Sequence, residues 1–184
     1  MMPGGVAFRM SEVTIRPEQP EDAGAVHRVL DAAFGTAQGS SGSAESVLHG
    51  HLQAAGDVLP TLTFVAELRG EVVGQVTCSQ GRLGERPAVG LGPIAVAPRV
   101  QRQGIGAALM SAVITTADQA GEPVIVLLGD PEYYGFFGFV PAASLGITAV
   151  GPWNRPEFMA RPLHAWRPEL SGPFRYAAAF DRFA

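Results

Sequence analysis

The stretch VQRQGIGAAL, residues 100–109, begins like a helix but lacks the residues that normally start one. Most helices begin on Ser, Thr, Asp or Asn, whose side chain accepts a hydrogen bond from a free backbone N–H, and acidic residues are favoured in the first turn. Here Gly104 and Gly106 open the helix, and Arg102 places a positive charge at the same end. Uncapped N–H groups beside glycines predict an anion-binding helix start, with phosphate as the usual ligand.

Several interpretations of this stretch are possible. The phosphate loop of nucleoside triphosphatases requires Gly-Lys-Ser or Gly-Lys-Thr, and residues 104–107 contain no Lys. A dinucleotide fingerprint requires a third glycine, where Leu109 stands, and a later acidic residue, to which Asp130 corresponds only approximately. A solvated helix start, whose glycines serve only a tight turn, remains open because Gly-x-Gly alone is a weak signal.

The segments on either side predict a βαβ unit. Residues 88–98 read as a strand that Gly92-Pro93 interrupts, so we expect a bulge or local splaying there. Residues 123–128, PVIVLL, form the continuous apolar run of a strand covered on both faces. Strand, helix and buried strand in this order predict a right-handed unit with parallel strands. The apolar face of the intervening helix, which ends at Gly121, consists of Ile105, Ala108, Leu109, Ala112, Val113 and Thr116.

The N-terminal half predicts strands and two helices. Residues 13–16 read as a strand, and the following helix begins near Pro20 and ends at Gly35. Its expected buried face is Val26, Leu30, Ala33 and Phe34. Residues 36–43 have the composition of a flexible loop, and residues 44–55 can form a second short helix.

The middle and the end of the chain add further strands. Residues 61–68 and 71–79 alternate apolar and polar side chains around Arg69-Gly70, which predicts a β-hairpin followed by a polar, Gly-rich link. The part after residue 128 predicts a short aromatic helix and two or three short strands. We expect residues 1–12 to be a flexible N-terminus and residues 13–184 to form one domain.

Composition excludes several classes of function. The formal net charge is −4 and no basic cluster occurs, so nucleic acid is not an expected partner. The start of the chain does not read as a signal peptide and no stretch is long enough to cross a membrane, so we expect a cytoplasmic protein. Cys78 reads as an ordinary strand residue. The four histidines show no metal-ligand pattern, because His49 and His51 would not share a helix face, so no metal is expected.

Two motifs in order carry a resemblance to a known family. Gln101-Arg102-Gln103-Gly104-Ile105-Gly106 resembles the Gln/Arg-x-x-Gly-x-Gly/Ala signature of the GNAT acyltransferase superfamily, with Ile94-Ala95-Val96 before it. Residues 134–139, YGFFGF, resemble its later Tyr-x-x-x-Gly-Phe element. The similarity extends over most of the chain, and the segments at 91–98, 129–142 and 156–163 look like the YhbS-like branch of N-acetyltransferases.

The resemblance implies a fold and a cofactor site. The fold is a mixed α/β, mostly antiparallel sheet that is splayed at a central parallel strand pair and flanked by helices. Acetyl-CoA would lie between the strands at 88–97 and 123–128. The backbone amides of Arg102, Gln103, Gly104, Ile105, Gly106 and Ala107, with Gln101 before them, would hold its pyrophosphate, and Ile94, Ala95 and Val96 would pair with its pantetheine arm. Relatives are often homodimers.

The resemblance also implies a reaction, direct transfer of an acetyl group to a primary amine of a small molecule or a peptide. Tyr134 matches the family's general acid, and a nearby helix start could lower the pKa of its phenol. Aromatic packing or simple contacts with CoA are the alternative role for this ring and for Tyr133. A base is harder to find, because residues 88–97 contain no titratable side chain. Glu67 could act through water or be a solvated strand end. The loop at 35–60 and the C-terminal region are expected to shape the acceptor cleft. A non-catalytic acyl-CoA-binding module is the alternative function.

Overall fold

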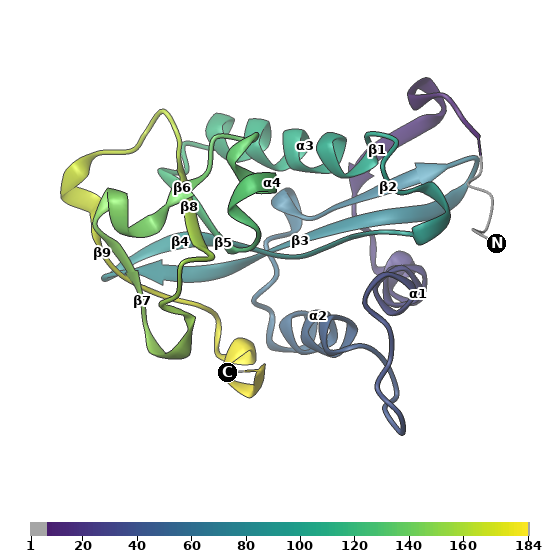
Figure 1. Cartoon of the computed structure of the whole chain (residues 1–184), viewed down its shortest axis with the longest axis horizontal. Coiled ribbons are helices and arrows are strands. Elements are labelled where there is room, and N and C mark those ends of the chain that lie inside the picture. The colour runs from purple at the N-terminus through teal and green to yellow at the C-terminus, as the bar shows by residue number, and fades with distance from the viewer. Residues whose placement is uncertain (1–6, 184) are drawn as a thin grey trace.

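One mixed sheet organises the chain, with helices on both of its faces (Figure 1). The structure is a computed structural model that describes residues 7–183. The strands in this part are β1 (Val13–Pro17), β2 (Phe64–Leu68), β3 (Glu71–Leu83), β4 (Arg86–Val96), β5 (Val124–Leu128), β6 (Val140–Pro141), β7 (Ile147–Ala149), β8 (Phe158–Pro162) and β9 (Gly172–Arg175). The α-helices are α1 (Ala23–Phe34), α2 (Ala44–Ala55), α3 (Ile105–Gln119) and α4 (Pro131–Gly135).

The sheet order is β1-β2-β3-β4-β5-β8-β6, and β9 pairs with both β3 and β7. The strands along the main path are antiparallel except at its centre, where β4 and β5 run parallel. The helix α3 connects these two strands, as expected for a βαβ unit. This arrangement confirms the predicted fold class, a mostly antiparallel sheet with a central parallel pair and flanking helices.

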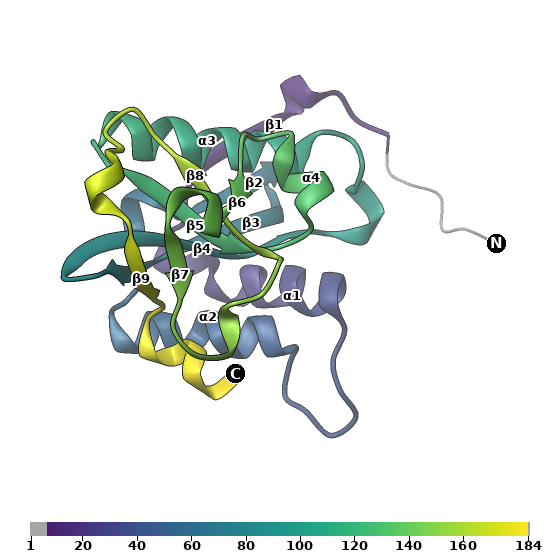
Figure 2. The same cartoon turned by 60° about the vertical axis from the view of Figure 1, so that its left-hand side comes forward.

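Helices cover the two faces unequally. Figures 1 and 2 place α3 over one face and α1 and α2 over the other. Along β2 the side chains alternate between these layers, since Phe64 and Ala66 belong to the same buried cluster as Leu109 of α3, whereas Val65 packs with Leu30 of α1. The buried residues of α3 include Met110 and Ala117, which were not expected, whereas the expected Ala108, Ala112 and Thr116 are half-buried. Within the described part no helix is long and apolar enough to cross a membrane.

The strands β3 and β4 form a longer hairpin than composition suggests. The expected Gly-rich link at residues 81–87 is wrong, because the ladder continues to the pair Leu83 and Arg86. Gly81 explains the continuation, since a Cβ atom at this position would lie 2.4 Å from the Phe174 ring of β9. The glycine allows close packing of β9 against the sheet, and the tertiary contact outweighs the low strand propensity of the segment.

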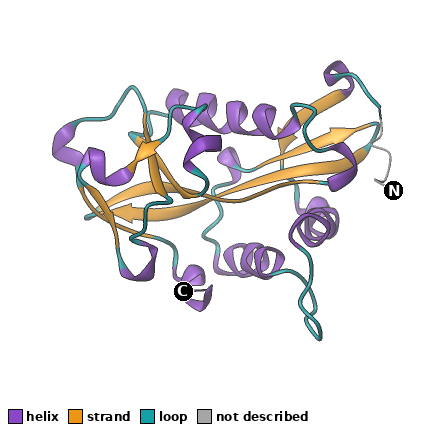
Figure 3. Ribbon diagram, in the orientation of Figure 1, coloured by secondary structure: helices purple, strands orange, loops and turns teal. Residues whose placement is uncertain are grey.

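Residues 7–12 and the loop between α1 and α2 lie at the periphery (Figure 3). Residues 1–6 lie outside the described residues, so flexibility there stays a prediction. Next to them, Met10–Glu12 form a 3-10 helix, and a Glu12 carboxylate oxygen lies 2.6 Å from the Arg69 guanidinium of the β2–β3 turn. Residues 35–43 form a projecting loop, as expected, and Ser43 at its end caps α2 by accepting a hydrogen bond from the Ser46 N–H.

Candidate active site

A bulge in β4 marks the place where the sheet opens. Val76 of β3 stands opposite Ile94, and Cys78 stands opposite Leu91, so Gly92 and Pro93 together face Thr77. This irregularity confirms the expectation from the Gly-Pro pair. Buried side chains of β3 support it. The Gln75 amide donates a hydrogen bond of 3.1 Å to the Pro93 carbonyl oxygen, and the Thr77 hydroxyl donates one of 2.9 Å to the Gln75 amide oxygen.

Beyond the bulge, β4 is no longer paired with β5. The parallel ladder consists of Val89 opposite Ile125 and Gly90 opposite Val126. On the other side, the Ala97 N–H donates to the Val73 carbonyl of β3. Because backbone groups alternate along a strand, those of Ile94 and Val96 point away from β3 toward the opened side, whereas those of Ala95 point toward β3. The splayed pair therefore presents the backbone groups of Ile94 and the Val96 N–H on its opened side, whereas the Val96 carbonyl accepts a hydrogen bond from the Gln101 side chain.

The start of α3 lies beside this opening. Arg102 and Gly104 adopt positive φ angles of 58° and 95°, which turn the chain sharply into the helix. Among the described residues, no side chain caps α3. Gly106 leaves room over the first turn, because a Cβ there would lie 3.1 Å from the Tyr133 hydroxyl oxygen. The Gln101 side chain instead contacts the strand, donating to the Val96 carbonyl at 2.9 Å. The helix start thus has free N–H groups and an open approach.

A cavity of about 550 Å³ connects the open strand to the helix start. This α3 cavity is lined by Ile94, Ala95, Val96, Gln101, Arg102, Gly104, Gly106, Ala107, Tyr133 and Tyr134. Of the expected cofactor residues, Ile105 is buried in the core under α3, and Gln103 is half-buried outside the lining. Neighbouring segments of the fold therefore bring most of the expected residues together around one space.

Tyr134 is held rigidly at the edge of the α3 cavity. Its ring occupies the space above Gly129 at the end of β5, where a Cβ would lie 2.0 Å from the ring. The helix α4 begins on Asp130, whose carboxylate accepts from the Glu132 N–H, and Pro131 follows at the first helical position. The Tyr134 N–H donates to the Asp130 carbonyl oxygen, and its own carbonyl accepts from the Phe137 and Phe139 N–H groups. Backbone and ring are both fixed.

The electrostatic environment of Tyr134 differs from the expected one. Burial, with smaller contributions from Tyr133 and Asp130, raises the pKa of the Tyr134 phenol to about 12. The expectation of a pKa lowered by a helix start is wrong, because α4 has only five residues and Tyr134 lies near its C-terminal end. At neutral pH the phenol therefore keeps its proton.

A second cavity, of about 460 Å³, adjoins the first at Tyr134 and Ile94. We call it the aromatic cavity. Its lining comprises Phe34, Ala44, Glu45, Leu48, Leu91, Gly92, Pro93, Ile94, Leu128, Tyr134, Trp153, Tyr176, Phe180 and Phe183. The α1–α2 region and the C-terminal region, expected near the acceptor, do line it. Figures 1 and 2 show the C-terminal turn, Ala178–Phe183, beside α2. Sequence reasoning did not single out Glu45 or Trp153.

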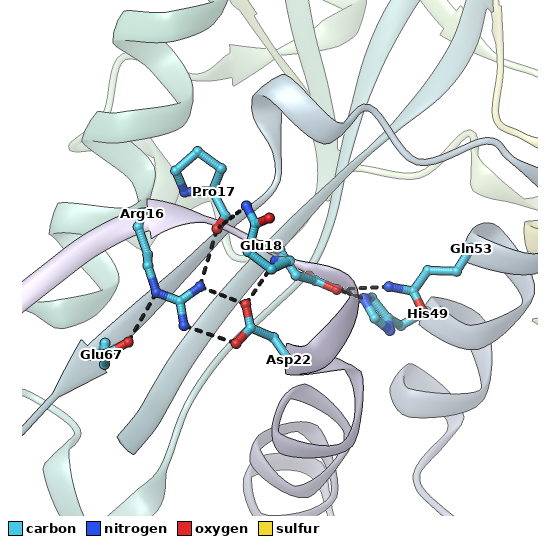
Figure 4. Close-up of polar contacts among 8 residues, drawn as sticks. Arg16, Pro17, Glu18, Asp22, His49, Gln53 and Glu67 are labelled. Atoms are coloured by element: carbon cyan, nitrogen blue, oxygen red, sulfur yellow. Dashed lines mark hydrogen bonds and ion pairs between the residues drawn. The ribbon is translucent and has the colours of Figure 1, made fainter. Parts of the chain in front are cut away.

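Glu67 and the histidines lie elsewhere. Figure 4 shows Glu67 bound to the Arg16 guanidinium, at 3.0 Å, and it lines neither cavity. Its assignment as a water-mediated base therefore has no geometric support. His49 is fully buried between Glu18 and His27, whereas the ring of His51 lies 6.4 Å from that of Phe183. Within residues 7–183, no group of three or more His, Cys, Asp or Glu side chains is placed to hold a metal ion.

The sheet opens beside an uncapped helix start, and Tyr134 lines the cavity there. The resemblance to acyltransferases described above implies this arrangement. The profile of the acetyltransferase (GNAT) family matches residues 27–136, and the chain belongs to this family. The uncharacterized N-acetyltransferase YhbS of Escherichia coli K12 is 30% identical over 175 residues, which cover 92% of this chain and 99% of YhbS.

Two solved structures extend the comparison. The E. coli GNAT family N-acetyltransferase YhbS in complex with CoA has a TM-score of 0.82 at 26% identity, covering 99% of this chain and 97% of YhbS. A GNAT family acetyltransferase from Brucella melitensis in complex with acetyl-CoA has a TM-score of 0.72 at 31% identity, covering 92% and 98% of the two chains. These matches confirm the expected class of N-acetyltransferases and the YhbS-like branch.

Proposed function

We propose that the protein transfers an acetyl group from acetyl-CoA to a primary amine, with Tyr134 as the general acid. The observation that carries this proposal is the continuity of the α3 cavity with the aromatic cavity at Tyr134 and Ile94. Acetyl-CoA fits the α3 cavity by its chemistry, because its pyrophosphate matches an uncapped helix start and its pantetheine amides match the backbone groups of Ile94 and the N–H of Val96 on the opened side of β4. When bound, it supplies an acetyl group activated as a thioester.

The residues of this chain have separate tasks in the transfer. A new bond forms between the amine nitrogen and the acyl carbon, the bond from that carbon to sulfur breaks, and the bonding electron pair goes to sulfur. The N–H of Ile94 or Val96 would stabilise the negative charge that develops on the acyl oxygen. The nitrogen loses a proton to water, and the Tyr134 hydroxyl donates one to the sulfur before being reprotonated from solvent.

The raised pKa of Tyr134 constrains the timing of this step. A phenol with a pKa of about 12 donating to a thiolate whose conjugate pKa is about 8.5 is uphill by about 5 kcal/mol. The donation is therefore expected to accompany cleavage of the carbon–sulfur bond and to be followed by rapid reprotonation of the phenolate. What Tyr134 contributes is a proton that is present at every physiological pH.

Thiol release from acetyl-CoA with a panel of amines tests the proposal. Tyr134→Phe should lower kcat by about 100-fold, because general acid catalysis contributes on that scale, while the Kd for acetyl-CoA stays near the wild-type value. An equal loss of kcat in Tyr133→Phe would contradict the assignment of the acid to Tyr134. Tight binding of acetyl-CoA without transfer to any amine would favour a binding module instead.

A further inference from the structure

The walls of the aromatic cavity are apolar over most of its lining. They comprise Phe34 of α1, Leu48 of α2, Leu128 of β5 and the rings of Trp153 and Phe180. The cavity volume of about 460 Å³ is in the range of small-molecule sites and too small for a folded segment of another chain. Such a cavity favours a small ligand with an apolar body.

The aromatic side of the cavity is rigid. The Trp153 ring centroid lies 6.0 Å from that of Tyr176 and 6.3 Å from that of Phe180, with nearly perpendicular ring planes. The Arg155 guanidinium carbon lies 5.6 Å from the Trp153 ring centroid, which further fixes the indole. Edge-to-face packing of this kind provides flat walls, and flat walls suit a ring-shaped ligand body.

The charge on the lining is limited to one side chain. Glu45, the second residue of α2, is half-buried and contributes a carboxylate, and the lining contains no Lys, Arg, His or Asp. One carboxylate attracts one ammonium group. A ligand with a second charge would bury it without a partner in an apolar space, which is strongly unfavourable.

The apolar lining also explains how the amine can lose its proton without a general base. Nucleophilic attack requires a neutral amine, and residues 88–97 provide no titratable side chain for deprotonation. Transfer of the amine from water into an apolar cavity disfavours its charged form and so lowers its pKa. Glu45 would attract the ammonium form during entry, and desolvation near Ile94 would then favour release of the proton to water.

We propose that the acceptor is a small monoamine whose single primary amino group is attached to an apolar body of about the size of an aromatic ring, and that it binds in the aromatic cavity. This inference rests on the function proposed above and names the substrate class of that site. Polyamines and peptide amino groups are disfavoured, since the former carry further charges and the latter bring several amide groups into a lining whose carboxyl and hydroxyl groups are those of Glu45, Tyr134 and Tyr176.

Tryptophan fluorescence can test acceptor binding without turnover. In a Trp166→Phe background, Trp153 is the one remaining tryptophan, and it lines the cavity. With CoA present, 2-phenylethylamine should change its emission saturably, and spermidine and a short lysine peptide should bind about tenfold more weakly or worse. The kcat/KM for acetylation should likewise be higher for 2-phenylethylamine than for spermidine or the lysine peptide.

Paired variants make the test specific. Phe34→Ser removes a cavity wall at a half-exposed position and should weaken 2-phenylethylamine binding about fivefold. Phe136→Ser changes a side chain that is 90% exposed and outside the lining, and binding should stay unchanged. Glu45→Gln should weaken binding, whereas Glu85→Gln, distant in the β3–β4 turn, should not.

The results separate this inference from the proposed function. Two results would overturn the acceptor class, provided that calorimetry still shows CoA binding. One is a preference for spermidine or the peptide, and the other is an equal effect of Phe34→Ser and Phe136→Ser on binding of 2-phenylethylamine. Failure of CoA to bind at all would instead overturn the proposed function, and with it the inference that rests on it.

Discussion

Ile94 and Tyr134 lie where two cavities adjoin, and each residue lines both of them. Ile94 belongs to the part of β4 that has separated from β5, and Tyr134 comes from the helix that follows β5. The bulge at Gly92-Pro93 thus separates the strands next to Ile94, and Tyr134 of α4 lines the cavity at this place. A reaction between a ligand in the α3 cavity and one in the aromatic cavity would take place beside these two residues, because they are the ones that the two linings share.

Filling the space above the first turn of α3 should block the coenzyme. Gly106→Val would place methyl groups near the Tyr133 hydroxyl and Val96. We expect the Kd for acetyl-CoA to rise about tenfold or more, or roughly 1.4 kcal/mol, measured by calorimetry. Gly24→Val is the matched control, because Gly24 is also the second residue of its helix but lies outside both cavities. Unchanged affinity in Gly106→Val would contradict the assignment of this cavity.

The pH dependence of turnover should lack an alkaline limb from Tyr134. Its pKa of about 12 keeps the phenol protonated, so kcat/KM should rise up to about pH 10 as the free acceptor amine, whose pKa is about 10, loses its proton, and should not fall within this range. Initial rates between about pH 6 and 10 measure this profile. A fall above about pH 8 that disappears in Tyr134→Phe would show that the phenol titrates in that range instead.

Asp22 should stabilise the N-terminal part of the fold. Its carboxylate accepts two hydrogen bonds from the Arg16 guanidinium, at 2.7 and 2.9 Å, and one from the Gln19 N–H at 2.8 Å (Figure 4). Asp22→Asn should lower the free energy of unfolding by about 2 kcal/mol, because the partly buried Arg16 guanidinium loses its charged hydrogen bonds to Asp22 and keeps Glu67 as its carboxylate partner. Urea denaturation at neutral pH measures this, and Glu21→Gln, an exposed neighbour, should have no comparable effect.

The same carboxyl group should contribute to the loss of stability in strong acid. The Arg16 hydrogen bonds, with a smaller contribution from the Gln19 N–H, hold the pKa of Asp22 below its usual value. The stabilisation is therefore fully present above the unfolded-state pKa of about 3.9 and is lost as the pH falls through the lower folded-state value. If Asp22→Asn changes the free energy of unfolding equally at neutral and strongly acidic pH, this assignment fails.

His27 should make the fold sensitive to mild acid. Burial, followed by the nearby His49, lowers the pKa of His27, and the carboxylates of Asp31 and Glu18 oppose this only partly. A histidine with a lowered folded-state pKa stabilises the fold above its unfolded value of about 6.5, and this contribution is lost as the pH falls below that value.

Urea midpoints at about pH 7.5 and 5.5 test this sensitivity. The urea midpoint of the wild type should be lower at the acidic pH than at the neutral one, and this decrease should be smaller in His27→Gln. His164→Gln provides the control, because the His164 side chain is 78% exposed. An equal fall in the wild type and His27→Gln would show that other groups cause the acid sensitivity.

Helix burial illustrates the limit of pattern reading. The helical spacing of Phe34 predicts a core position on α1, yet this side chain is 49% exposed and lines the aromatic cavity. Val29 is buried on that helix instead. Periodicity identifies the apolar side of a helix, but the neighbouring elements decide how far along the helix that side is covered. The last turn of α1 extends past its packing partners, so its apolar residue borders a cavity.

The sequence by itself determined the features that depend on backbone chemistry over a few residues. Gly104 and Gly106 without a cap, Gly92-Pro93 inside a strand, and Tyr134 before Gly138-Phe139 predict the helix start, the bulge and the position of the tyrosine. Only the tertiary structure decided the aromatic cavity and the acidity of Tyr134. Phe34, Glu45, Trp153 and Phe180 are distant in sequence, and their arrangement around one space follows from packing. The pKa of Tyr134 is raised for the same physical reason, because burial depends on every element around the ring.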